Sequence, residues 1–145
     1  PILGVHDLIV HDYGPGRRIL SLHAEVPASG DILELHDVVD GLERELNEEL
    51  GCLATIHMDP VVNDGGLTAE TRERVAAMVR IIDPGIGIHD FRLVPGPTHV
   101  KLIFDAEVPY QCPLSDQEVK RRIQAGVQAL DSSWSAVVGI DKSYV

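Results

Sequence analysis

Hydrophobic and polar positions along the first third of the chain predict three strands. Residues 5–12 and 18–26 are strand-like runs, and the GPG turn at 14–16 between them suits a hairpin. Residues 52–59 form another such run, which ends at Pro60. In this last run Ala54, Ile56 and Met58 alternate with His57 and Asp59, so we expect one core face and one polar face.

Between the second and third runs the apolar spacing changes to that of a helix. Ser29 and Asp31 offer capping oxygens before it, and Gly51 ends it. Its apolar stripe consists of Leu35, Val38, Val39, Leu42, Leu46 and Leu50. The glycine-containing segment after the third strand predicts a linker at 63–67.

The rest of the chain predicts a similar order of elements. A helix is expected near 68–82, capped by Thr68 and ended before Pro84. The further expected elements are strands at 88–94 and 98–108, a helix at 115–130 and a strand at 134–141. This order is α-β-β-α-β, for which an antiparallel sheet with helices on one face is the usual α+β arrangement.

Two motifs recur in the same order and indicate an internal duplication. GVHDL at 4–8 returns as GIHDF at 87–91, and AEVP at 24–27 returns as AEVP at 106–109. We therefore predict two units, residues 1–62 and 68–145, of which the first lacks the leading helix. The chain begins at Pro1 without a methionine, which suggests a fragment of a longer protein.

Charge and cysteine content indicate which binding partners and which cellular compartment suit the chain. Twelve basic against 23 acidic residues give a net charge of −11, which disfavours nucleic acid and anionic membranes and favours cations. Cys52 and Cys112 form no disulfide framework or metal knuckle, so a reducing cytosol is the simplest compartment. No apolar run reaches the length of a membrane helix and no secretory signal begins the chain, which we therefore expect to be soluble.

Histidines are concentrated in the first half, where five of the seven lie. His23 shares the polar parity of its strand, and His57 and Asp59 project together from theirs. His6 shares parity with Leu8 and Val10, so a later strand start or a bulge is needed to turn it towards the others. Imidazole and carboxylate are ligands for zinc and its first-row neighbours, and one ion or two ions sharing Asp59 would suit this set. The alternative for each residue is a solvated position on a half-exposed strand.

The ordered set of GVHDL, the GPG turn, SLHAEVP, LELHDVVDGLE and IHMDP resembles the cytoplasmic C-terminal domain of the cation diffusion facilitator family of divalent-metal exporters. The resemblance is strong over residues 4–61 and weaker, through the repeat, over 68–142. It implies a ferredoxin-like fold, here in two tandem units, that dimerises at the cytoplasmic side of the membrane beneath the transporter's transmembrane part.

The same resemblance implies a zinc-type metal site and a regulatory role without catalysis. The family's ligand positions correspond to five residues of this sequence: His6, His23, His36, His57 and Asp59. In the family, ion binding is thought to draw the protomers together and favour transport, which physically is a population shift.

The second copy departs from this ligand pattern. Through the repeat, His6 corresponds to His89, His23 to Asp105 and Asp59 to Asp141, while His36 and His57 correspond to Gln117 and Gly139. His89, Asp105 and Asp141 define a second weak site for a harder ion, or else a degenerate site. The two copies then pack as an intrachain pseudo-dimer, or the second decorates a homodimer of the first.

Two other functions are compatible with parts of the sequence. His36 and Asp37 form an HD dyad, as in metal-dependent phosphohydrolases, although that chemistry needs a helical bundle and an open metal position. A ferredoxin-like sensor for a small organic molecule is the other alternative, and it leaves the histidines of the first half unexplained.

Overall fold

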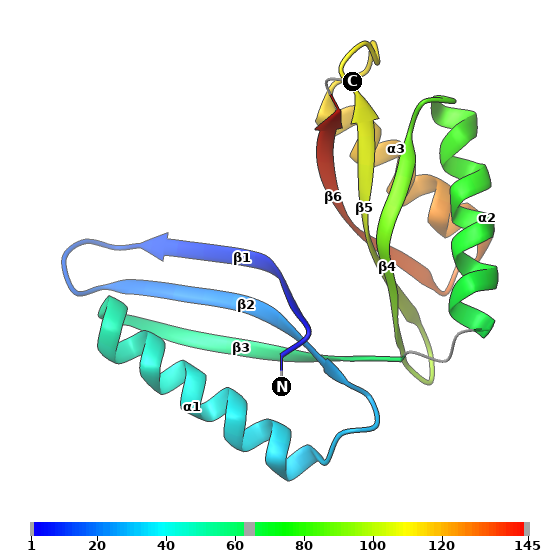
Figure 1. Cartoon of the computed structure of the whole chain (residues 1–145). Helices are drawn as coiled ribbons and strands as arrows, with labels where there is room; N and C mark the ends of the chain where they lie inside the picture. Colours follow the sequence, from blue (N-terminus) through cyan, green and yellow to red (C-terminus); the bar gives the residue numbers. More distant parts are fainter. Residues whose placement is uncertain (1, 63–65, 144–145) are drawn as a thin grey trace. The chain divides into compact units, whose positions relative to one another are not determined.

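The computed structural model describes residues 2–62 and 66–143, and within them it contains three helices and six strands (Figure 1). The chain divides into two compact units, unit 1 up to Val61 and unit 2 from Val62 onward. Each unit has its own three-stranded sheet. The α+β class and the pattern of two tandem ferredoxin-like units are confirmed. Residues 63–65 of the expected linker lie outside the described residues.

Unit 1 consists of β1 (Gly4–Asp12), β2 (Arg18–Pro27), α1 (Ile32–Leu50) and β3 (Cys52–Val61). The strand order is β1-β2-β3, with β1 antiparallel to β2 and β2 parallel to β3. The expectation of an antiparallel sheet is therefore wrong for this second pair. Because α1 carries the chain from the end of β2 back to the level where β2 began, the strand that follows must run parallel to β2.

Helix α1 covers one face of the unit 1 sheet (Figure 1). Its Leu46 packs against the buried side chains of Leu20, Cys52 and Ala54, which project from β2 and β3 on that face. The helix begins where the Asp31 carboxylate accepts hydrogen bonds from two backbone N–H groups of the first turn. The opposite face of the same sheet carries no helix of unit 1.

Unit 2 follows the predicted α-β-β-α-β order. Its elements are α2 (Gly66–Ile82), β4 (Gly87–Pro95), β5 (Val100–Pro109), α3 (Asp116–Leu130) and β6 (Trp134–Ser143). The strand order is β4-β5-β6, again with one antiparallel and one parallel pair. Both units thus share one topology, apart from the leading helix present only in unit 2.

The start of α2 differs from the prediction. The helix begins at Gly66, so Thr68 lies inside its first turn instead of at the cap. Capping residues mark a helix start only statistically, and boundaries drawn from them vary by one or two residues.

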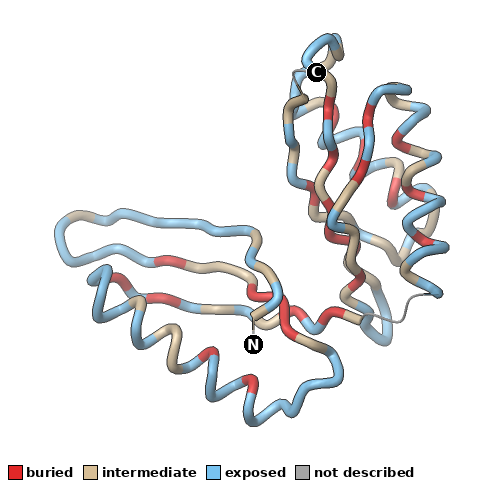
Figure 2. Tube along the Cα trace, in the orientation of Figure 1, coloured by how far each residue is buried: buried red, intermediate tan, exposed pale blue. Residues whose placement is uncertain are grey.

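The core of unit 2 lies between its sheet and its two helices. Phe104 and Leu102 of β5 pack with Val75 and Val79 of α2 and Ile123 of α3, and all five are at most 1% exposed. Figure 2 shows buried positions recurring along the strands and helices of this unit. Aliphatic residues dominate this core, as expected from the low aromatic content.

Candidate metal centre

A β-bulge in β1 turns His6 towards the face that carries the other histidines. His6 pairs with His23 of β2, but the next paired residue, Ile9, lies opposite Ser21, so β1 contains one extra residue. Asp7, within this bulge, has a positive φ of 52°. The bulge reverses the side-chain parity of β1, which explains how His6 and His23 share a face although simple alternation separates them.

Strand register then aligns three histidines across the sheet. His6, His23 and His57 lie opposite one another on β1, β2 and β3, and we call them the histidine row. The ring centroids of His6 and His23 are 5.1 Å apart, and those of His23 and His57 are 4.8 Å apart. Two residues further along β2 and β3, Glu25 and Asp59 pair on the same face, and we call them the carboxylate row.

The Asp59 carboxylate contacts all three imidazoles. Its Oδ2 lies 3.0 Å from Nε2 of His6 and 3.0 Å from Nδ1 of His23. Its Oδ1 lies 3.4 Å from Nε2 of His57. Asp59 is only 2% exposed, whereas the His57 side chain is 65% exposed, so the site opens to solvent at its β3 end.

Glu25 is a buried member of this site that sequence analysis did not select. It is 1% exposed, and its Oε1 lies 3.2 Å from Nδ1 of His6. Its position two residues after His23 on the same strand places it on the polar face, which was the available indication in the sequence. Nothing in the sequence, however, indicated that this part of the face is buried.

One nitrogen of the site has no hydrogen bond. Nε2 of His6 is buried and, despite its short distance to Asp59, has no hydrogen-bond partner of acceptable geometry among the described residues. Buried polar atoms are normally satisfied, so an orphaned imidazole nitrogen beside two buried carboxylates favours a cation at this place. His6, His23 and Asp59 each offer a ligand atom, and these atoms lie within 4.8 Å of one another.

His36 is not brought into this group. It is exposed on α1, and α1 covers the face of the sheet opposite to the histidine row. Its neighbour Asp37 is also exposed, and among the described residues no metal-compatible group includes this HD pair. His11 and His99 are exposed as well, and the His11 ring stacks on Tyr13.

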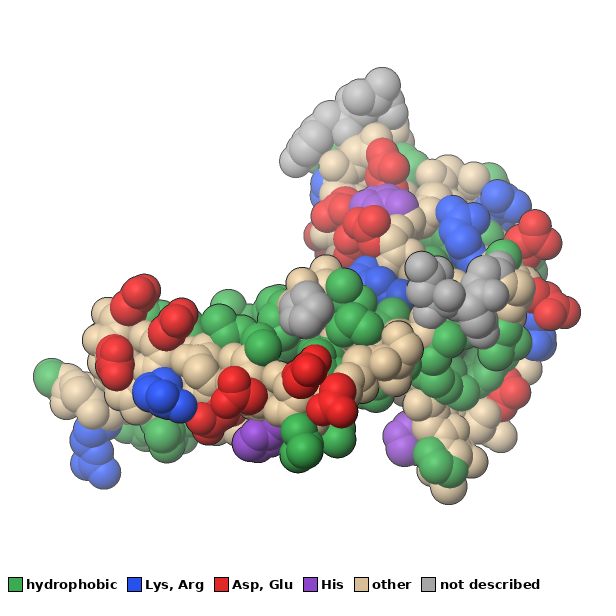
Figure 3. All heavy atoms as spheres, turned by 60° about the horizontal axis from the view of Figure 1, so that its bottom comes forward, with side chains coloured by type: hydrophobic (Ala, Val, Ile, Leu, Met, Phe, Trp, Pro, Cys, Tyr) green, Lys and Arg blue, Asp and Glu red, His purple; other side chains and the backbone are tan. Residues whose placement is uncertain are grey.

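The corresponding part of unit 2 holds a more exposed group. The bulge recurs in β4, where Asp90 has a φ of 54°, and His89 again pairs with the middle strand, opposite Asp105. Nε2 of His89 lies 3.3 Å from Asp141, and its Nδ1 lies 3.9 Å from Asp105 and 3.4 Å from Asp90. Asp90, not selected from sequence, forms a group with His89 and Asp105 whose ligand atoms lie within 4.8 Å of one another, and Asp141 contacts the same histidine. Figure 3 shows a histidine among acidic side chains on the visible face of this unit.

Burial and electrostatic repulsion both disfavour the charged form of Asp105 in this second group. Partial burial and the neighbouring Asp141 carboxylate raise the pKa of Asp105 above its ordinary value, against a smaller opposing effect of His89. Gly139, at the position equivalent to His57, leaves room for Asp105, because a Cβ there would collide with the Asp105 carboxylate. The group is therefore built around carboxylates, with one imidazole.

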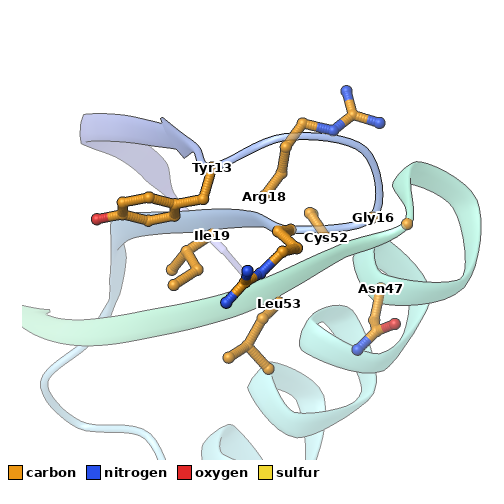
Figure 4. A pocket seen from close by; sticks show the side chains of 9 residues that line it. Tyr13, Gly16, Arg18, Ile19, Asn47, Cys52 and Leu53 are labelled. Carbon is orange, nitrogen blue, oxygen red and sulfur yellow. The ribbon is translucent and has the colours of Figure 1, made fainter.

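A separate pocket of about 410 Å³ lies at the hairpin end of unit 1 (Figure 4). Tyr13, Arg18 and Asn47 contribute to its lining, and Arg18 donates a hydrogen bond to the backbone carbonyl of Leu50 at the end of α1. A cation near the last carbonyls of a helix offsets their partial negative charge, which accounts for Arg18 without a ligand. The histidine row does not line this pocket.

Residues 1–61 match the family model described as cation efflux protein, cytoplasmic domain. Unit 1 belongs to this family. It is a family of transporters, not of enzymes, and the matched region contains both the histidine row and the carboxylate row. Comparison with curated proteins gives no match. Within the described residues, no helix is long and apolar enough to cross a membrane.

Proposed function

We propose that unit 1 is the regulatory metal-binding domain of a divalent-cation efflux transporter and that it binds zinc or a similar first-row ion. The observation that carries this proposal is the buried Nε2 of His6, which lacks a hydrogen bond and lies 3.0 Å from the buried Asp59 carboxylate. Two more imidazoles lie on the same face. The family supports the transporter context.

The donor set fits zinc in type and spacing. Imidazole nitrogens and carboxylate oxygens bind zinc at about 2.0–2.2 Å, so donors of one ion must lie within roughly 4 Å of each other. Asp59 lies 3.0 to 3.4 Å from a nitrogen of each histidine in the row. Small rotations of these side chains suffice to direct His6, His23 and Asp59 at one ion.

Asp59 can serve one ion or two. Its Oδ2 faces His6 and His23, and its Oδ1 faces His57. A carboxylate divided in this way can bridge two ions, one held by His6 and His23 and the other near the exposed His57. With a single ion, His57 would be available at the exposed edge of the site as a further ligand.

His36 can take part only from a second copy of the domain, because α1 lies on the other face of its own sheet. We propose that a bound ion at the solvent-open end of the histidine row recruits His36 of a partner protomer and so favours a closed homodimer. The chain's net charge of −11 opposes association of empty copies, and bound cations reduce that repulsion. Preferential binding to the closed state then couples metal concentration to transport on the cytoplasmic side.

Isothermal titration calorimetry tests the metal site. The wild-type chain is titrated with zinc, manganese, cobalt and cadmium beside the double variant His57→Ala, Asp59→Ala and the control His11→Ala. His11 is an exposed histidine outside the row. We expect zinc binding in the wild type and the control and its loss in the double variant. Equal binding by the double variant would refute the site.

A further inference from the structure

Glu25 is an unusual residue for its position on the central strand β2. It is a carboxylate with 1% exposure, beside a second buried carboxylate, Asp59. Burying a carboxylate costs free energy unless hydrogen bonds or a cation compensate it. We therefore expect the neighbouring groups of the site to compensate this carboxylate.

The contact of Glu25 with His6 determines which imidazole nitrogen faces the candidate site. Oε1 of Glu25 lies 3.2 Å from Nδ1 of His6, and both side chains are at most 9% exposed. When the Glu25 carboxylate is ionised it can only accept a hydrogen bond, and Nδ1 of His6 then donates and carries the proton. In the neutral ring Nε2 then holds the lone pair, and Nε2 is the buried atom without a hydrogen-bond partner beside Asp59.

Gly4 provides the space for this carboxylate. Gly4 pairs with Glu25 across the strands, and a Cβ at position 4 would lie 2.9 Å from Oε2 and 3.0 Å from Cδ of Glu25. The backbone of Gly4 is outside the left-handed region, so conformational freedom does not explain the glycine. Because glycine has no side chain, it leaves the space that the Glu25 carboxylate occupies.

Unit 2 has the same residue types at the equivalent places but not the same contact. Gly87 pairs with Glu107, yet Glu107 is exposed and a Cβ at position 87 would meet nothing within 4 Å. His89 instead directs Nδ1 towards Asp90 and Asp105. The contact between Glu25 and His6 is thus not a general consequence of this topology.

We propose that Glu25 is a positioning residue of the metal centre, which holds His6 as the Nδ1–H tautomer and presents Nε2 to the ion. The proposal rests on the metal-binding function proposed above. Hydrogen bonding of a histidine ligand to a carboxylate orients the ring and raises its basicity, and loss of such a partner typically lowers metal affinity roughly 10- to 100-fold.

Two sets of variants with matched controls test this role. Glu25→Ala removes the acceptor, Glu25→Gln keeps an acceptor oxygen without the charge, and Glu107→Gln is the control in unit 2. Gly4→Ala displaces the Glu25 carboxylate while leaving Glu25 and His6 in the sequence, and Gly87→Ala is its control. Thermal unfolding in the presence of a chelator verifies that each variant is folded, and the Gly4 pair keeps the test available if Glu25→Ala does not fold.

The readouts are the tautomer of His6 and the zinc affinity. Nitrogen-15 NMR of the metal-free wild type should show the Nδ1–H form of His6, assigned by comparison with His6→Gln. In Glu25→Ala the population should move towards the Nε2–H form, and zinc affinity by calorimetry should fall roughly 10- to 100-fold. Glu25→Gln should retain the tautomer and lose less affinity, Gly4→Ala should weaken binding, and both controls should match the wild type.

The results separate this proposal from the one on which it rests. If the wild type binds zinc but Glu25→Ala leaves the tautomer or the affinity unchanged, the positioning role is wrong and the metal site stands. If the wild type binds no zinc at all, the metal-binding function itself is wrong, and the role of Glu25 falls with it.

Discussion

The two units place different chemistry on one backbone arrangement. Both contain the bulge, with φ values of 52° and 54° at equivalent aspartates, and both align three positions across the sheet. In unit 1 these positions are His6, His23 and His57, and in unit 2 they are His89, Asp105 and Gly139. The bulge therefore persists where two of the three histidines are missing, so topology alone does not specify the proposed metal site.

The units also differ in what is buried. In unit 2 the hydrophobic side chains of two helices and the sheet form a continuous core, while the group around His89 is largely exposed. In unit 1 the buried hydrophobic cluster is small, and Glu25 and Asp59 are among the most buried side chains. We conclude that unit 2 has an extensive hydrophobic core, whereas unit 1 has a smaller core and also buries two carboxylates at its polar site.

The largest expected effect is the loss of zinc-dependent stability in unit 1. A ligand that binds only the native state adds about 2.7 kcal/mol to the free energy of unfolding at roughly a hundredfold excess over its Kd. We expect such a shift in scanning calorimetry of the wild type and its loss in the double variant His57→Ala, Asp59→Ala. Asp141→Ala, the equivalent change in unit 2, should leave the shift in place. A shift that survived in the double variant would show that zinc binds elsewhere.

A transfer of histidines should create binding in unit 2. Asp105→His together with Gly139→His places imidazoles at the positions of His23 and His57, beside the existing His89 and Asp141. We expect the zinc stoichiometry measured by calorimetry to increase. Gly139→His alone should gain less, because its Cβ meets the Asp105 carboxylate. If the double variant binds no additional zinc, the residues aligned across the sheet are not sufficient for a site.

Zinc affinity of unit 1 should fall as the pH decreases towards 5, because protons compete with the ion for imidazole nitrogens. We propose that the group around His89 is a weaker site for a harder ion such as manganese, since three of its four members are carboxylates. Residual metal binding to this group should therefore depend less on pH in this range. Titrations at a series of pH values measure both. An affinity of unit 1 that stayed constant with pH would argue against histidine ligands.

The smallest expected effect concerns the stability of unit 2 without metal. The pKa of Asp105 is raised in the folded state, mainly by burial and also by Asp141, so its charged form disfavours folding. This cost is present at neutral pH and disappears as the pH falls through the raised pKa. Asp105→Asn should therefore increase the free energy of unfolding at pH 7 by about 0.5 kcal/mol or less, since solvent screens the exposed part of the group. Chemical denaturation at pH 7 and at acid pH should show the gain only at pH 7.

The sequence was sufficient for the order of elements, because hydrophobic periodicity and the repeated GVHDL and AEVP motifs are local features. Parity also placed His23, His57 and Asp59 on one face, and the structure has this arrangement. The direction of β3 was predicted wrongly, because strand pairing depends on where α1 returns the chain and not on the pattern within β3.

Other features of the sites depend on contacts that no local pattern reveals. Glu25 is buried and contacts His6 of the neighbouring strand, and Asp90, which has a positive φ at the second bulge, contacts His89. The position of His36 follows from the choice of sheet face that α1 covers. Sequence spacing could place Glu25, Asp90 and His36 at polar positions, but it could not predict which side chains each of them contacts.

The most direct test of the proposed metal centre is anomalous diffraction at the zinc edge from crystals of the chain grown with zinc. We expect an anomalous peak at unit 1 within coordination distance of Asp59 and of nitrogens from His6 and His23, with any peak near His89 weaker. A structure with zinc bound only at unit 2, or with no zinc near Asp59, would contradict this account.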